Sequence, residues 1–238
     1  MKHPDSFVFE VIDVGTTDST NSHAKRLILA GAVPGIAVLA QAQTRGYGQQ
    51  GRSWVSPPGA GMYLSALVKP LEIPTWLPLL TALAVTDALA ALTPEVRIKW
   101  VNDIVARGKK LGGILVEQVR GIAICGIGLN LETPNSVEGA IGLAELSNVA
   151  LTANELAARV LDALADRLDR CSRDGISSIA GPWLERCAHH GADVVIEGVG
   201  GCSVGLGPAG ELCLELRDGN KRMFLSGSLR MANGTYCG

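Results

Sequence analysis

A glycine-rich segment followed by paired prolines places the strongest limit on the fold. Residues 46–51 read G-Y-G-Q-Q-G and follow an apolar run at 35–41 that predicts a strand. This spacing is typical of dinucleotide-binding folds only where a helix opens at the glycines. Here R-S-W-V-S-P-P comes next, and Pro57 and Pro58 cannot lie in the first turns of such a helix. The sequence therefore excludes the dinucleotide-binding fold and predicts a long loop over residues 42–61.

The loop carries groups that suit a nucleotide ligand. Its glycines allow backbone N–H groups to approach a ligand closely. Arg45 and Arg52 offer guanidinium groups for phosphate, and Trp54 offers an indole face for a planar base. Loops of this length are usually functional or disordered. A ligand-binding loop is the favoured interpretation, and a solvated surface loop is the alternative.

A second group of polar residues follows two apolar segments further along the chain. K-W-V-N-D at 99–103 ends a predicted strand with a cation, an amide and a carboxylate. K-L-G-G at 110–113 opens another predicted strand with a lysine beside paired glycines. Taken singly, these patterns are typical of a solvated strand edge and of a turn. Only the combination of these two segments with the loop favours a ligand-binding site.

Hydrophobic periodicity predicts an α+β fold in two parts. Strands are predicted at 7–14, 35–41, 62–69, 96–100, 103–106, 111–118 and 121–131, and helices at 19–31, 76–92, 152–173 and 176–188. Thr152 and Glu155 predict a capping box. After Gly191, short β segments are predicted at 193–197, 202–206, 211–216 and 222–226. We therefore expect one domain at 1–188, with a mixed central sheet flanked by helices, and a small β-rich domain at 189–238.

Composition limits the class of protein further. The formal net charge of −2 gives no bias toward nucleic acid or anionic lipid. The N-terminus lacks the apolar region of a signal peptide, and the apolar run at 77–92 is short for a membrane span. None of the six cysteines forms a C-x-x-C pair, so they predict small reduced side chains rather than a zinc site. A soluble, cytoplasmic protein without a permanently bound cofactor is expected.

Five segments, taken in order, resemble the motifs of the biotin protein ligase family. They are D-S-T-N at 18–21, Q-T-R-G-Y-G-Q-Q-G-R-S-W at 43–54, K-W-V-N-D at 99–103, K-L-G-G-I-L-V-E at 110–117 and G-I-G-L-N at 126–130. The resemblance covers almost the whole chain. It implies a biotin/lipoyl ligase-like catalytic domain and an SH3-like C-terminal β-barrel.

The activity that this resemblance implies is that of a biotin–[biotin carboxyl-carrier protein] ligase. Such an enzyme activates biotin with ATP and Mg²⁺ to biotinyl-5'-AMP, then transfers biotin to a lysine on the biotin-carrier domain of a carboxylase. Relatives that repress transcription carry an N-terminal winged helix, for which the motif at 18–21 leaves no room. We therefore expect no DNA binding and no membrane partner. The oligomeric state stays open, a homodimer included.

The resemblance also assigns roles to individual residues. The implied catalytic residues are Lys110, Arg52 and Asn102. The implied biotin-binding residues are Ser19, Thr20, Asn21, Gln43, Gly46, Tyr47, Gly113, Gly126 and Leu129. The implied nucleotide-binding residues are Gln49, Gln50, Arg52, Trp54, Asn102, Lys110 and Asn130. Asp103 is the implied Mg²⁺ ligand, and the loop at 43–54 would fold over the intermediate and exclude water.

The sequence departs from the family pattern at four positions within these motifs. Gln49 and Gln50 stand where two arginines are usual, Tyr47 where a basic residue is common, and Val101 where proline is usual. The loop is therefore less cationic than the family norm, and two consequences are open: weaker retention of the adenylate, or replacement of the missing charge by another cation such as Arg45. Two alternatives remain open at this point: a lipoate-type acyl ligase of the same fold, and a degenerate protein that binds biotin or its adenylate without transferring it.

Overall fold

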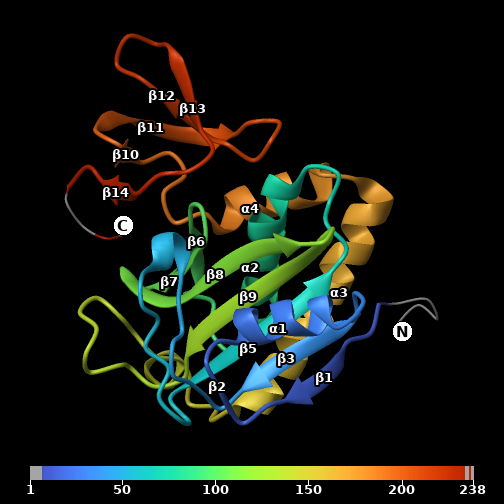
Figure 1. Ribbon diagram of the computed structural model, residues 1–238. Coiled ribbons are helices and arrows are strands. Elements are labelled where there is room, and N and C mark those ends of the chain that lie inside the picture. Colours follow the sequence, from blue (N-terminus) through green and yellow to red (C-terminus); the bar gives the residue numbers. More distant parts are fainter. Residues whose placement is uncertain (1–6, 234–235, 237–238) are drawn as a thin grey trace.

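The computed structural model describes residues 7–233 and Tyr236 and contains a seven-stranded mixed sheet (Figure 1). Its strands, in sheet order, are β1 (Glu10–Asp13), β3 (Ile36–Ala40), β5 (Gly61–Val68), β9 (Ile122–Asn130), β8 (Lys109–Val119), β7 (Asp103–Ala106) and β6 (Arg97–Lys99). β1 runs parallel to β3, and the remaining neighbours pair antiparallel. The predicted mixed sheet is confirmed, and the strands predicted at 103–106 and 111–118 pair as the antiparallel neighbours β7 and β8.

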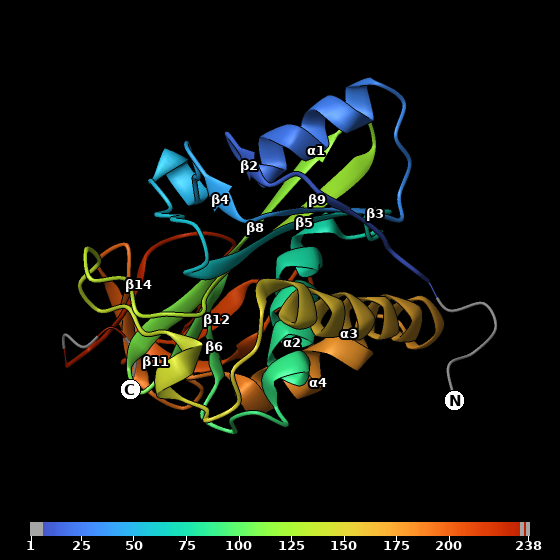
Figure 2. The ribbon, with the colours of Figure 1, turned by 90° about the horizontal axis from the view of Figure 1, so that it is seen from below.

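Helices cover both faces of this sheet (Figure 2). Helix α1 (Thr20–Leu29) lies on one face against β3, β5 and β9, whereas α2 (Leu77–Leu89) and α3 (Ala153–Asp174) lie on the other. Helix α4 (Ser177–Arg186) packs against α2 and α3. The capping box is confirmed: the Thr152 hydroxyl accepts from the Glu155 amide at 3.2 Å, and the Glu155 carboxylate accepts from the Thr152 amide at 2.8 Å.

The C-terminal part of the chain forms a separate five-stranded antiparallel sheet, seen in orange and red in Figure 1. Its strands are β10 (Asp193–Ile196), β11 (Val199–Leu206), β12 (Leu212–Glu215), β13 (Lys221–Phe224) and β14 (Leu229–Met231), in the order β13-β12-β11-β10-β14. Trp76, just before α2, joins it to the first part by donating from its indole to the Pro208 carbonyl at 2.9 Å. The arrangement is consistent with a small barrel-like domain, and a division after residue 188 stays a prediction.

Short elements account for the differences from the predicted strands and helices. Within the loop predicted at 42–61, β4 (Ala42–Gln43) pairs with β2 (Thr16–Thr17), and a 3₁₀ turn covers Gln49–Gly51. Strand β14 was also not predicted. Two or three residues are too few to carry a readable period, and the sequence pattern therefore missed β2, β4, β14 and the 3₁₀ turn.

Across residues 7–233 and 236, no helix is both long and apolar enough to cross a membrane. Cys125, Cys171, Cys187, Cys202 and Cys213 are free thiols, as expected for small reduced side chains. Burial raises the pKa of the Cys125 and Cys187 thiols to about 12, so neither is a reactive thiolate at neutral pH. Cys237 and His3 lie outside the described residues.

Candidate active site

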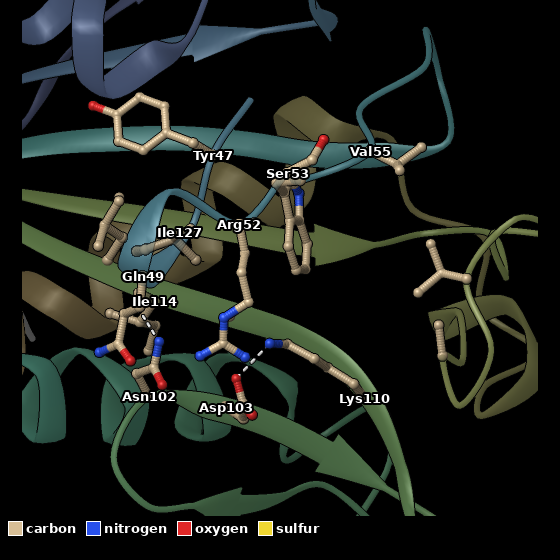
Figure 3. A pocket seen from close by; sticks show the side chains of 18 of the residues that line it. Tyr47, Gln49, Arg52, Ser53, Val55, Asn102, Asp103, Lys110, Ile114 and Ile127 are labelled. Carbon is tan, nitrogen blue, oxygen red and sulfur yellow. Dashed lines mark hydrogen bonds and ion pairs between the residues drawn. The ribbon is translucent and has the colours of Figure 1, made fainter. Parts of the chain in front are cut away.

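A pocket of about 350 Å³ opens where the loop at 43–54 faces strands β8 and β9. The turn after β6 closes a second side, and residues 227–229 of the C-terminal sheet reach its rim. Figure 3 shows the loop side chains above the strands and the Lys110–Asp103 pair below. Five segments that are far apart in the sequence therefore contribute to one cavity.

Glycines on β8 and β9 form the floor of the pocket. A Cβ at Gly128 would lie 2.7 Å from the Trp54 indole, which is closer than real Cβ contacts allow. A Cβ at Gly126 would overlap the Asn21 amide, and one at Gly113 would touch Lys110 at 3.4 Å. Absence of side chains at these positions lets Trp54 and Asn21 lie directly on the sheet.

One end of the pocket is rich in neutral hydrogen-bonding groups. Ser19 and Thr20, at the start of α1, are almost fully buried. Gln43 accepts from the Thr20 amide at 2.8 Å and donates to the Ser56 hydroxyl at 2.8 Å. The Gln43 side-chain amide is therefore held in one orientation. Such a wall recognises an uncharged polar ligand by hydrogen bonding rather than by charge.

Behind this end lies a group of five residues that we call the Glu117 cluster: Asn21, Lys25, Tyr47, Ser65 and Glu117. Lys25 contacts Glu117 at 2.7 Å, and the Tyr47 hydroxyl donates to the same carboxylate at 2.9 Å. Burial would raise the pKa of Glu117, but hydrogen bonds from Lys25, Asn21 and Tyr47 together lower it below its usual value. Glu117 is therefore ionised at neutral pH.

The other end of the pocket is charged. Lys110 Nζ lies 2.5 Å from Asp103 Oδ1 and 5.6 Å from the centre of a Trp54 ring. Figure 3 shows Arg52 extending from the loop toward this pair. Tyr236 donates its hydroxyl to the Asp103 carboxylate, and Lys99 Nζ lies 3.4 Å from the centre of the Tyr236 ring. Cations and one carboxylate thus meet where an anionic ligand would be bound.

Two asparagines complete the charged end. Asn102 donates to the Ile114 carbonyl at 2.7 Å, which fixes the turn after β6 against β8. Asn130 donates to the Ile141 carbonyl at 3.2 Å and ties the end of β9 to the end of the segment at 134–141. The Trp100–Val101 peptide bond in the same turn is cis.

The chain matches a family model across the residues that form most of this pocket. The model describes the biotin/lipoate A/B protein ligase family and matches residues 14–132. The chain belongs to this family. It is 33% identical to a biotin–[acetyl-CoA-carboxylase] ligase of Mycobacterium tuberculosis, with 85% of this chain and 82% of that protein covered. It is 34% identical to the ligase of that name from Paracoccus denitrificans, covering 75% of this chain and 81% of that protein.

Solved structures of the family share the fold over nearly the whole chain. A biotin protein ligase from Aquifex aeolicus in complex with biotin and ATP superposes with a TM-score of 0.85 at 29% identity. The superposition covers 94% of this chain and 99% of that one. The resemblance to biotin protein ligases in the sequence is therefore confirmed at the level of family and fold.

Most residues that the family resemblance assigned to the site line the pocket. They are Ser19, Thr20, Asn21, Gln43, Tyr47, Gln49, Arg52, Trp54, Asn102, Asp103, Lys110, Gly113, Gly126 and Asn130. The structure brings them together from α1, the loop, the turn after β6, β8 and β9. Their individual roles toward a ligand stay predictions.

Three of the assigned residues lie outside the pocket lining. Leu129 is buried in the hydrophobic core because strand alternation places it on the opposite face from Gly128 and Asn130. Gly46 is a packing position, with its missing Cβ facing the Trp54 carbonyl at 2.6 Å. Gln50 is exposed and has a left-handed backbone, with φ of 56°, in the 3₁₀ turn. The structure places these three outside the pocket lining, and their assignment to ligand contact stays a prediction.

Several lining residues were not assigned from the sequence. They include Tyr63, Lys99, Val101, Gly128, Glu138, Ser228 and Tyr236. Lys99 stands in the motif at 99–103, but the sequence does not show that its side chain is buried. In the structure only 5% of Lys99 is exposed, and this burial marks it as part of the pocket. Ser228 and Tyr236 come from the C-terminal region, which carries no motif that marks them.

Proposed function

We propose that this protein joins the biotin carboxylate to AMP and then transfers biotin to a lysine on the biotin-carrier domain of a carboxylase. The observation that carries the proposal is one cavity with a neutral amide-rich end and a cationic end. Biotin has the matching polarity, with an uncharged ureido ring at one end and a carboxylate at the other. The relatives from Mycobacterium tuberculosis and Paracoccus denitrificans carry the name of this activity.

The first step brings two anions together, so its barrier depends on positive charge at the meeting point. A biotin carboxylate oxygen attacks the α-phosphorus of ATP, a new P–O bond forms, and pyrophosphate leaves with the electron pair of the broken bond. Lys110 and Arg52 would offset the charge that develops there, which is usually the largest catalytic contribution. Lys110 approaches from β8 and Arg52 from the loop, and together they would orient the reacting groups.

The second step releases AMP. The amine of the acceptor lysine attacks the carboxyl carbon of biotinyl-5'-AMP, the amide bond forms, and AMP leaves as the acyl–phosphate bond breaks. Trp54 and Asn130 would hold the adenylate, and the loop at 43–54 would exclude water that otherwise hydrolyses the mixed anhydride. Ser19, Thr20 and Gln43 would hold the ureido end throughout.

The charged end also fits a magnesium ion that enters with ATP. Mg²⁺ usually binds through one or two carboxylates together with substrate phosphates and waters, and Asp103 offers such a carboxylate in the lining. When bound, the ion would neutralise part of the negative charge of the triphosphate. Asp103 would hold it, and Asn102 would orient the nucleotide beside it.

Further features of the protein in the cell belong to this proposal as well. We expect it to act in the cytoplasm on a carboxylase, without binding DNA or membrane, and to carry no permanently bound cofactor. A homodimer remains one expectation for its assembly. We also propose that residues 1–188 and 189–238 are its two domains.

A carrier-labelling assay tests the proposed function. Purified protein, ATP, Mg²⁺ and biotin should label a biotin-carrier domain, and biotin but not lipoate should drive pyrophosphate release. Release driven by lipoate instead would favour the lipoate-type ligase. Folded protein that binds biotin yet neither releases pyrophosphate nor labels the carrier would be a binder without transfer activity, with Gln49 and Gln50 as the first residues to examine.

A further inference from the structure

The Glu117 cluster joins three elements at one carboxylate. Glu117 on β8 accepts from Lys25 of α1 at 2.7 Å and from Tyr47 of the loop at 2.9 Å. Lys25 also donates to the Tyr47 hydroxyl at 3.1 Å, so the three side chains form a closed triangle. The loop is thereby attached to both the helix and the sheet at this point.

Asn21 extends the cluster into the pocket floor. Its amide nitrogen donates to Glu117 at 2.9 Å, and its carbonyl accepts from the Ser65 hydroxyl at 2.6 Å. These two bonds fix which way the amide faces. Asn21 is 4% exposed, lines the pocket and fills the space above Gly126. Glu117 does not line the pocket, so its effect on a ligand passes through Asn21 and Tyr47.

The loop is held at its start, where the Thr44 and Arg45 amides donate to the Thr17 and Asp18 carbonyls at 2.9 and 2.8 Å, whereas from Gly46 to Trp54 its backbone is bonded mainly to itself. The Gly48 amide donates to the Arg52 carbonyl at 2.8 Å, and the Trp54 amide donates to the Gly46 carbonyl at 2.9 Å. These bonds give the turn its shape without attaching it to the sheet. The hydroxyl of Tyr47 supplies such an attachment, on the far side of the pocket from Lys110 in Figure 3.

We propose that Glu117, paired with Lys25, is a positioning residue that latches the loop at 43–54 over the pocket through Tyr47 and orients Asn21 beneath the ligand. Lys25 and Glu117 keep only 34% and 25% of their side chains exposed, so their attraction is less screened than on an open surface. These contacts shape the wall of the site that biotin, whose identity as ligand rests on the proposed function, would enter.

Limited proteolysis with trypsin tests the latch without any ligand. Arg45 and Arg52 are exposed cleavage sites within the loop. In Tyr47→Phe and Glu117→Gln variants, cleavage at these two sites should rise roughly tenfold, as expected for loss of one or two charge-assisted hydrogen bonds. The matched control is Glu95→Gln, which breaks an exposed ion pair with Arg107 and should leave loop cleavage unchanged.

The outcomes separate a latch from a general structural role. Unchanged cleavage at the loop sites in Tyr47→Phe would overturn the proposal, as would an equal rise at every tryptic site. The Tyr47→Phe variant retains the Lys25–Glu117 pair, so it keeps the test open if Glu117→Gln does not fold.

The affinity for biotin and the KM for ATP provide a second test of the latch. Biotin affinity measured by calorimetry should weaken roughly tenfold in Tyr47→Phe, and the KM for ATP should change by less than about twofold. Equal changes in both constants would contradict a role confined to the amide-rich end. If the wild-type protein binds biotin and shows the protease-resistant loop but exchanges no pyrophosphate, the proposed function fails and the latch stands.

Discussion

The imidazole of His189 accepts a hydrogen bond at Nε2 from the backbone amide of Trp100, at 3.1 Å. Its Nδ1 lies 3.0 Å from the Ser203 hydroxyl of β11 and carries the proton, because Nε2 is an acceptor. One fully buried, neutral ring thus links the turn that carries Asn102 and Asp103 to the C-terminal sheet. The C-terminal part of the chain therefore contributes to the geometry of the charged end.

Stability should fall on mild acidification because this ring resists protonation. Burial first, and then the charge of Lys99, lower the pKa of His189 from 6.5 to about 3. Below pH 6.5 the unfolded chain therefore binds a proton at this ring that the folded chain does not bind. The contribution of His189 to the free energy of unfolding is complete above pH 6.5 and is lost as the pH falls toward 3. Between pH 7.5 and 5 the loss from this group is about 2 kcal/mol.

Urea unfolding at several pH values checks the role of His189. His189→Gln keeps a hydrogen-bonding side chain without a titrating ring, so its free energy of unfolding should lose most of the slope between pH 6.5 and 5. His190→Gln, at the exposed neighbour, should retain that slope. A wild-type slope in both variants would assign the acid sensitivity to other groups.

Removal of the Lys110 amine should abolish most of the activating step. In Lys110→Ala, biotin-dependent exchange of pyrophosphate into ATP should fall about 100–1000-fold, the usual cost of removing one preorganised charge-stabilising group. Lys109→Ala is the matched control, because Lys109 is the exposed neighbour on the same strand. Equal losses in both variants would mean that β8 rather than the amine is responsible.

A methyl group at Gly128 should damage the site more than the fold. The added Cβ would lie 2.7 Å from the Trp54 indole, so Trp54 must move in Gly128→Ala. We expect kcat/KM for ATP to fall at least roughly tenfold. Gly200→Ala is the control, since its Cβ would meet neighbours at 4.0 Å and it lies on β11, outside the pocket lining. A similar activity in the two alanine variants would place Trp54 outside the nucleotide site.

The sequence predicted the main elements and marked fourteen residues of the lining, because strand patterns and motifs are short-range signals. Apolar runs bounded by turn residues placed β5, β8 and β9, and the Thr152–Glu155 capping box placed the start of α3. The ordered motifs then brought the loop and the strands β8 and β9 to one site. Such signals reside within a few neighbouring residues.

What the sequence did not predict depends on contacts between distant segments. No local pattern reveals that Lys99 is buried or that Ser228 reaches the pocket. The same is true of the triangle formed by Lys25, Tyr47 and Glu117, whose members come from three separate elements. Leu129 shows a related limit of the motifs, which do not tell on which face of a strand a side chain lies. It stands in a family motif, but strand alternation turns it into the core.

Gln49 and Gln50 offer a direct test of how charge in the loop retains the intermediate. Gln49 lines the pocket, whereas Gln50 is exposed outside the lining. A cation at position 49 would attract the adenylate phosphate, so Gln49→Arg should slow the release of biotinyl-5'-AMP by roughly tenfold. Gln50→Arg adds the same charge one residue away, beyond the lining, and should change the release rate by less than about twofold.

Rapid filtration of the radiolabelled intermediate at two salt concentrations measures these release rates. The effect of Gln49→Arg should persist at high salt, because a pair inside a partly enclosed pocket is screened less than an exposed one. Equal slowing in both variants, removed by salt, would indicate a general surface attraction rather than a contact with the phosphate. Equal release from Gln49→Arg and the wild type would mean that Arg52 and Lys110 already hold the phosphate fully, and that Gln49 has no part in its retention.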